Sequence, residues 1–159
     1  MRPSPANRSW PEADTRLEVS IQQQSLTLFR NGKSQFSAPV STAARGIGFE
    51  EGSFQTPTGH FIVRERIGEG APLRTFFNGR LPKGIGSANS DDAILTRILW
   101  LEGLDENNRN SYRRYIYFHG THEEHLIGQP ASHGCIRLKN RDMLTLFDLT
   151  PIFTRVDIL

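Results

Sequence analysis

The chain has 159 residues and a formal net charge of +2 at pH 7, a length that fits a single domain with its own hydrophobic core. Its only cysteine excludes an internal disulfide, so folding does not require an oxidising compartment. Because no basic run is interleaved with aromatics and no apolar run reaches the roughly 18 residues needed to span a bilayer, we expect neither nucleic-acid binding nor membrane insertion.

Residues 1–14 are rich in proline and serine and have almost nothing apolar to bury, which predicts a poorly ordered N-terminal arm. The arm has no apolar core of the kind found in secretory signals. Taken at face value, this predicts a cytoplasmic protein, or a periplasmic one if the chain has been trimmed. Residues 15–159 are then one domain.

The first part of that domain reads as a β-hairpin with a strand before it. Leu17–Ile21 and Ser25–Arg30 alternate apolar and polar residues, which is the strand period. Asn31-Gly32 separates the second run from Ser34–Val40. Such a pair between two strands predicts a tight turn that needs positive φ at both positions.

The middle of the chain predicts further strands with irregular connections. His60–Arg66 has strand character, and residues 71–92 read as loop with short strands at most, because prolines and glycines interrupt them. Ala93–Leu101 is the most apolar stretch; its β-branched content favours a central strand over a buried helix. Glu102–Ser111 is polar and turn-like.

The C-terminal third adds strands and a helix. Arg114–Phe118 alternates as a strand does, and Arg141–Leu149 has one apolar face, which predicts a short helix that Asn140 could cap. Ile152–Leu159 reads as a closing strand after Pro151. The fold class expected is mainly β, a sandwich or barrel-like domain with one or two short helices.

The single thiol lies in Ser132-His133-Gly134-Cys135. A cysteine near histidines fits a nucleophile with a base, because a thiol needs help to ionise near neutral pH. Gly134 would let the chain turn tightly enough for backbone amides to converge as an oxyanion site. The alternative is a buried, inert cysteine.

Two histidines are candidates for direct roles beside the thiol. His119 ends a predicted strand, and Gly120 after it relieves backbone crowding, so His119 is placed to accept the thiol proton. His133 lies two residues before Cys135 and would point to the same side in an extended segment. It could be the base, an oxyanion donor or a packing residue.

A metal site is the rival interpretation. His119, His122 and His125 are spaced by three residues and could bind zinc together with His133 and Cys135. That spacing places ligands on one face only in a helix. Since Gly120 and the preceding strand argue against a helix, we expect no metal.

The pattern His119-Gly120-Thr121, then Ser132-His133-Gly134-Cys135-Ile136-Arg137, resembles the catalytic domain of the L,D-transpeptidases (YkuD-type) of bacterial cell-wall metabolism. The segment 56–61 and the hairpin 26–40 also resemble that family. The resemblance covers about residues 17–158. It implies a β-sandwich-like catalytic fold without a metal or organic cofactor.

The resemblance also implies roles. Cys135 would attack the carbonyl between meso-diaminopimelate and the terminal D-alanine of a peptidoglycan stem and form a thioester. His119 would be the general base, oriented by a backbone carbonyl near Gly120. His133 with the amides of Gly134 and Cys135 would hold the oxyanion. Carbapenem-type β-lactams would acylate the same cysteine.

Three further residues are candidate substrate contacts. Many family members have Asn where this chain has Arg137, which could bind a substrate carboxylate bidentately or pair with Asp142 or another acid. Ser132 could shape the turn or contact substrate. Thr121 is the third candidate.

The acceptor of the acyl group decides the reaction. With water, the enzyme would be an L,D-carboxypeptidase that trims soluble muropeptides in recycling, which we favour. With an amine of a second stem, it would be a transpeptidase that forms 3-3 crosslinks. A zinc hydrolase and a non-catalytic binding domain are the remaining alternatives.

Overall fold

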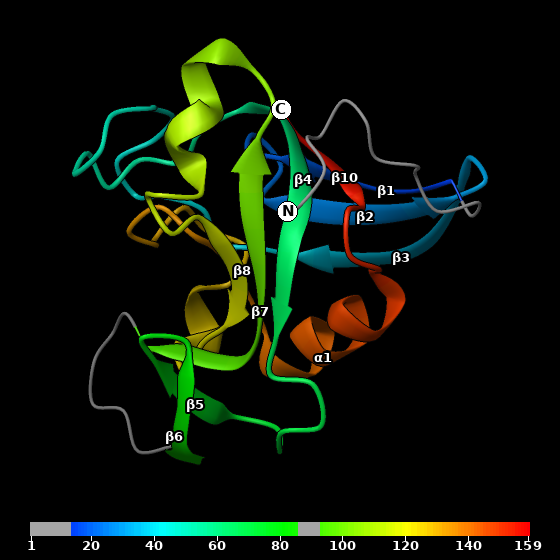
Figure 1. Cartoon of the computed structure of the whole chain (residues 1–159), viewed down its shortest axis with the longest axis vertical. Coiled ribbons are helices and arrows are strands. Elements are labelled where there is room, and N and C mark those ends of the chain that lie inside the picture. The colour runs from blue at the N-terminus through cyan, green and yellow to red at the C-terminus, as the bar shows by residue number, and fades with distance from the viewer. Residues whose placement is uncertain (1–13, 86–92) are drawn as a thin grey trace, which may run out of the picture.

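The computed structural model describes residues 14–85 and 93–159, and its architecture is mainly β, as predicted (Figure 1). The strands belong to one mixed sheet that does not close into a barrel, with the order β3-β2-β1-β10-β4-β7-β5-β6 and with β8 joining β7 to β9. The strands are β1 (Thr15–Ser20), β2 (Ser25–Arg30), β3 (Lys33–Pro39), β4 (Gly59–Ile67), β5 (Thr75–Asn78), β6 (Leu81–Ile85), β7 (Ile94–Gly103), β8 (Tyr117–Gly120), β9 (Ile136–Leu138) and β10 (Arg155–Ile158). The helical elements described are η2 (Glu106–Ser111), η3 (Glu124–Leu126) and α1 (Asn140–Leu149).

The predicted hairpin is confirmed. Asn31 and Gly32 have φ of 53° and 78°, the left-handed values that a two-residue turn between twisted strands requires. Arg30 pairs with Lys33 across the turn, and β1 continues the antiparallel sheet beyond β2.

The predicted central strand is confirmed as β7, and the buried-helix alternative is wrong. Leu99 and Leu101 of β7 face the main core, while Ile98 and Trp100 face a second, smaller apolar cluster. Successive side chains of a strand point to opposite faces. Because both faces of β7 are covered, its central residues 98–101 are all apolar and lack the usual alternation.

Helix α1 covers the main core with Met143, Leu146 and Phe147. It begins at Asn140, which the sequence had suggested as the cap. The amide of Asn140 donates to the carboxylate of Glu124 (2.8 Å), so an acid from η3 satisfies the helix N-terminus in place of a residue next to it.

The strand predicted over Arg114–Phe118 is wrong at its beginning. Tyr115 has φ of 58°, which interrupts an extended chain, and β8 starts only at Tyr117. The predicted turn over Glu102–Ser111 is in part the end of β7 and in part the short helix η2. Of residues 71–92, the described part forms the hairpin of β5 and β6.

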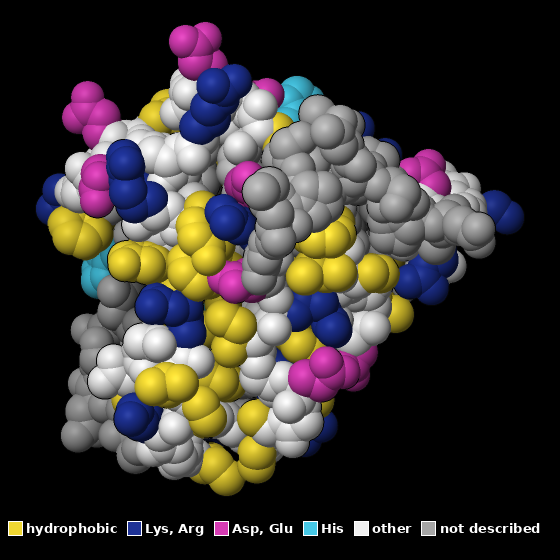
Figure 2. Space-filling model, viewed as in Figure 1, with side chains coloured by type: hydrophobic (Ala, Val, Ile, Leu, Met, Phe, Trp, Pro, Cys, Tyr) yellow, Lys and Arg dark blue, Asp and Glu magenta, His cyan; other side chains and the backbone are white. Residues whose placement is uncertain are grey.

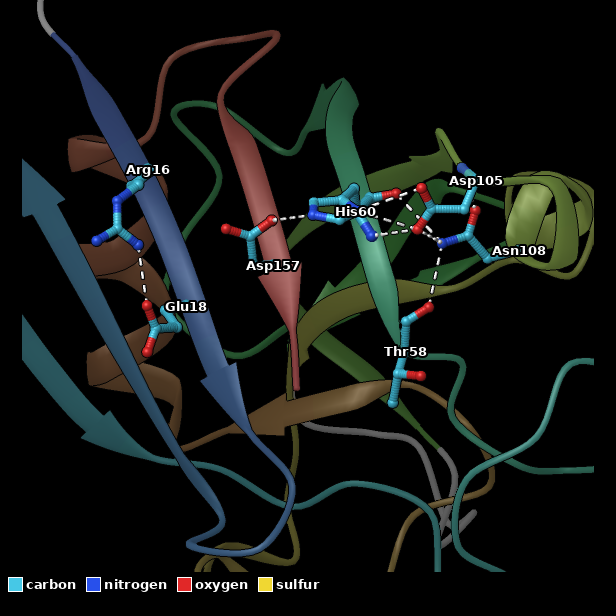
Figure 3. Close-up of polar contacts among 7 residues, drawn as sticks. All are labelled: Arg16, Glu18, Thr58, His60, Asp105, Asn108 and Asp157. Carbon is cyan, nitrogen blue, oxygen red and sulfur yellow. Dashed lines mark hydrogen bonds and ion pairs between the residues drawn. The ribbon is translucent and has the colours of Figure 1, made fainter.

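A polar network fastens η2 to the sheet (Figure 3). Asp105, which precedes η2, accepts hydrogen bonds from the amide of His60 on β4 (2.8 Å) and from the side chain of Asn108 (3.3 Å). The amide nitrogen of Asn108 also donates to the carbonyl of Thr58 (3.1 Å). The chain that leads from η2 to β8 is thereby anchored at its beginning.

On the face shown in Figure 2, acidic and basic side chains are interspersed rather than gathered by sign. No helix among residues 14–85 and 93–159 has the length and apolar character to cross a bilayer. The arm predicted over residues 1–14 lies outside the described residues, apart from Asp14.

Candidate active site

Two neighbouring parallel strands bring the predicted nucleophile and base to one face of the sheet. In the β8–β9 ladder, His119 lies opposite Arg137 and Phe118 opposite Ile136. Phe118 and Ile136 face the main core. Cys135 packs on the second cluster with Tyr117, so Tyr117, His119 and Cys135 share the other face.

The thiol of Cys135 lines an open cavity of about 230 Å³. Its Sγ donates to the carbonyl oxygen of Tyr115 at 3.3 Å. The positive φ of Tyr115 turns that carbonyl toward the sulfur, whereas a continuous strand would have used it in the ladder. The cavity walls come from three segments far apart in the sequence: Glu51, Gly52 and Phe54; Arg113, Arg114, Tyr115 and Ile116; and His133, Gly134 and Cys135.

His119 is 2% exposed, and its Nδ1 lies 2.6 Å from the carbonyl oxygen of Gly120. Because a carbonyl can only accept, Nδ1 carries a hydrogen, and in the neutral form of the ring Nε2 is then the nitrogen that can accept a proton. This is the backbone orientation that the resemblance implied for a base. A proton acceptor on Nε2 is the state that a thiol requires.

Gly120 is needed for close packing rather than for an unusual φ. A Cβ at this position would lie 2.3 Å from Oδ1 of Asn140 and 2.9 Å from the carbonyl oxygen of Leu95. A side chain at this position would therefore collide with Asn140 and with β7, which explains why a glycine follows His119.

The turn before the thiol is closed by Ser132. Its hydroxyl donates to the carbonyl of Cys135 (2.6 Å) and accepts from the amide of Gly134 (3.2 Å). Ser132 thus has the turn-shaping role among its two alternatives and is 2% exposed. The Gly134 amide is engaged within the turn, so its predicted oxyanion role would require it to exchange Ser132 for substrate.

Thr56 is a residue whose part in the site was not predicted from the sequence. Its hydroxyl donates to the carbonyl of Gly134 (2.8 Å) and accepts from the amide of Ala43 (3.0 Å). Gly134 has φ of 127°, which a side chain would oppose, and a Cβ there would also approach the carbonyl of Gln55. The segment 54–56 therefore packs against the turn at Gly134 and fixes its position.

His133 is exposed and lines the cavity with Cys135. Its ring meets Phe54 edge-on, with centroids 5.9 Å apart. This placement keeps the imidazole at the cavity mouth, where the predicted contact with a developing oxyanion stays a prediction.

Two of the predicted substrate contacts are buried. The side chain of Arg137 is 2% exposed and pairs with Glu123 at 2.8 Å. This is the pairing alternative, with Glu123 in place of Asp142. Thr121 is fully buried, and its hydroxyl accepts from the amide of Glu123 (3.0 Å), so substrate could reach neither side chain without displacing these contacts.

The metal alternative lacks a ligand set in the described part of the chain. His119 is buried in β8, His122 is half-buried and His125 is exposed on η3. Across residues 14–85 and 93–159, no three His, Cys, Asp or Glu side chains are grouped so that they could hold a metal ion.

Burial shifts two further groups around the thiol. It raises the pKa of Tyr117, although the hydrogen bond from Arg80 opposes it. Burial also lowers the pKa of Arg114, while the charges of Cys135 and Glu51 oppose it. No sequence signal marks Arg114, and the resemblance of the segment 56–61 assigns no role to Thr56, because both roles arise from contacts between distant segments.

The open mixed sheet, with an imidazole on β8 and a thiol on the residue before the adjacent parallel strand β9, defines a β-fold catalytic domain. Residues 14–158 match the family model of the L,D-transpeptidase catalytic domain (YkuD). The chain therefore belongs to the L,D-transpeptidase family.

Among curated relatives, YkuD of Bacillus subtilis (strain 168) is 26% identical over 89% of this chain and 64% of its own length. YbiS of Escherichia coli (strain K12) is 42% identical over 32% of this chain and 18% of its own length. The chain thus spans less than two thirds of these relatives.

Solved structures share the fold. An L,D-transpeptidase from Xylanimonas cellulosilytica superposes with a TM-score of 0.62 and 22% identity, over 96% of this chain and 64% of its own. L,D-transpeptidase 3 from Mycobacterium tuberculosis, solved with a faropenem-derived adduct, gives 0.60 and 16% identity, over 92% and 60%.

Proposed function

We propose that the chain is a cysteine acyl-transfer enzyme that cleaves the meso-diaminopimelate–D-alanine bond of peptidoglycan stem tetrapeptides, with water as the favoured acceptor. Family membership supports an enzyme of this class. The observation that carries the mechanism is the pair on one face of β8 and β9: a thiol lining an open cavity, and an imidazole with Nδ1 held by the Gly120 carbonyl.

In the proposed reaction, Nε2 of His119 accepts the proton of the Cys135 thiol, and the sulfur attacks the scissile carbonyl carbon. The amide of Cys135 and the imidazole of His133 stabilise the oxyanion, joined by the Gly134 amide if it leaves Ser132. The C–N bond then breaks, D-alanine leaves with the proton held by His119, and a thioester remains. Water activated by His119 hydrolyses the thioester and frees the thiol.

The size of the cavity favours water over a second stem. About 230 Å³ lies below the range of roughly 300–1,000 Å³ typical of ligand sites. The described walls thus suit the end of one peptide, and the remaining opening suits a small acceptor. A transpeptidase that forms 3-3 crosslinks is the second candidate, because relatives carry that family name.

The central experiment is mass spectrometry of the products from soluble tetrapeptide with the wild type, Cys135→Ala and Cys135→Ser. Tripeptide from the wild type alone supports the proposal. Dimers without tripeptide would transfer the assignment to crosslinking, and activity of Cys135→Ala would remove the mechanism.

Covalent inhibition gives a second test. Solved relatives include LdtMt1 in complex with imipenem and the avibactam carbamoyl form of Ldtfm. We propose that imipenem acylates Cys135 here, which intact-mass measurement would detect as one adduct, absent from Cys135→Ala and unaffected by a chelator. Loss of the adduct in chelator would favour the zinc alternative.

We also propose that the substrate is a soluble muropeptide met during recycling in the cytoplasm, as the sequence reading expects. Cell fractionation with immunoblotting tests the compartment. Recovery of the native protein from the periplasmic fraction would contradict this part while leaving the chemistry in place.

A further inference from the structure

The cavity beside the thiol is walled by a cation, Arg114, that has no acidic hydrogen-bond acceptor among the described residues. Arg114 is half-buried, and among the described residues each hydrogen-bond acceptor of its guanidinium is neutral. Nη2 donates to the carbonyl of Gln55 (2.7 Å) and to Oγ of Ser53 (3.2 Å), and Nη1 to the carbonyl of Gly48 (3.4 Å). A partly desolvated cation whose hydrogen bonds all go to neutral groups is stabilised further when an anion joins it.

The acidic residue that lines the same cavity forms its ion pair with a different cation. Glu51 pairs with Arg113 at 3.5 Å, and both side chains are mostly exposed, at 63% and 72%. Exposed pairs are screened and contribute little. The two adjacent arginines therefore differ: Arg113 lies at the rim in an ion pair with a carboxylate, while Arg114 is half-buried and, within residues 14–85 and 93–159, forms no such ion pair.

Arg114 is fixed beside the turn that presents the thiol. The Gln55 carbonyl that accepts from Nη2 lies 3.3 Å from where a Cβ on Gly134 would be. Arg114 also precedes Tyr115, whose carbonyl accepts from the thiol. The guanidinium is thus held by acceptors of the segment 48–55, whose Gln55 carbonyl lies against the Gly134 turn, and its position does not depend on a charged surface partner.

We infer that Arg114 binds the terminal carboxylate of the substrate peptide and so restricts the enzyme to free D-alanine ends. The inference rests on the proposed function for the identity of the peptide. Guanidinium binds carboxylates through paired, charge-assisted hydrogen bonds. Arg137, the cation that the sequence suggested for this task, is already paired with Glu123.

The first test separates anion binding from catalysis. Iodoacetate carries a carboxylate where iodoacetamide carries a neutral amide. Both reagents alkylate Cys135: the thiolate forms an S–C bond and iodide leaves. In Arg114→Gln we expect the iodoacetate-to-iodoacetamide rate ratio to fall about tenfold relative to the wild type, the scale of one charge-assisted contact. Arg114→Lys should retain part of the preference.

Arg113→Gln is the matched control, because it removes the same charge from the adjacent position. Its ratio should change by less than about threefold, since exposed charges are screened. An equal loss of the rate ratio in Arg113→Gln and Arg114→Gln would overturn the assignment, because it would reflect the general electrostatic field. An equal fall of both alkylation rates in Arg114→Gln would also overturn it, because it would reflect an altered thiol.

The second test uses peptides. For tetrapeptide with a free D-alanine carboxylate, Arg114→Gln should raise KM about tenfold with kcat changed by less than about threefold, and it should leave the C-terminal amide unaffected. Equal effects on both peptides would contradict carboxylate binding even if the protein remains an active carboxypeptidase. The two proposals can fail separately. If the iodoacetate-to-iodoacetamide ratio changes as expected but the wild type makes no tripeptide, the anion site is supported and the proposed reaction is rejected.

Discussion

The hydroxyl of Thr56 allows the most direct test of how the thiol is positioned. Thr56→Val replaces the hydroxyl by a methyl group of similar volume and removes two hydrogen bonds, one to the Gly134 carbonyl and one from the Ala43 amide. Thr56 and Ala43 are each 1% exposed. Both backbone groups would therefore lose a partner away from water.

Each unsatisfied buried group costs about 1–3 kcal/mol, so we expect Thr56→Val to lower the free energy of unfolding by about 2–4 kcal/mol. Thr56→Ser keeps the hydroxyl and loses one methyl group, a cost of about 1 kcal/mol. Urea unfolding followed by tryptophan fluorescence measures both. With a slope of about 2 kcal/mol per molar, the midpoint of the valine variant should fall by about 1–2 M.

The same pair of variants should separate in thiol chemistry, because the Gly134 carbonyl fixes the turn that carries Cys135. Alkylation by iodoacetamide under native conditions should differ from the wild type in Thr56→Val and match it in Thr56→Ser. If the valine variant proves as stable as the serine variant, the hydroxyl does not hold the turn and the reasoning is refuted.

Three other outcomes follow from the packing. Gly120→Ala should lower the free energy of unfolding by about 1–3 kcal/mol through overpacking against Asn140. In chemical denaturation this cost should shrink in an Asn140→Ala background, and an additive double mutant would contradict the contact. Glu123→Gln leaves the buried Arg137 without its acid and should cost about 2–4 kcal/mol, measured by thermal unfolding against Glu106→Gln as a surface control. Burial tends to raise the pKa of Asp105, but hydrogen bonds from His60 and Asn108 outweigh it and lower this pKa. The Asp105 carboxylate therefore stabilises the fold above its unfolded pKa, and this stabilisation is lost as pH falls through the folded pKa. Asp105→Asn should flatten the decline of unfolding free energy toward acid pH, and an unchanged slope would refute this.

The sequence predicted those parts of the local structure that depend on residues close together in the chain. Asn31-Gly32 predicted the hairpin because only residues that tolerate positive φ suit its turn. The apolar run of β7 predicted a covered central strand, and the motif predicted that the segment of His119 lies beside the segment that follows Cys135, as β8 and β9 do.

The contacts that complete the site were not predictable in the same way. Glu124 caps α1 from another element, and Thr56 reaches Gly134 across 78 positions of sequence. Arg137 and Arg114 differ only in what the fold places around them, an acid for one and neutral carbonyls for the other. Composition and residue spacing do not show which distant residues the fold places next to each other.

The contribution of Tyr115 to the thiol is a main-chain oxygen, aimed by a left-handed backbone. Homologues should therefore drift widely in side-chain chemistry at this position yet remain restricted to amino acids that accept that conformation, with Gly, Asn and Asp favoured over Val and Ile. Engineering here should choose replacements by the dihedral angles they tolerate, since a swap that preserves the ring's polarity but not the bend would misdirect the oxygen.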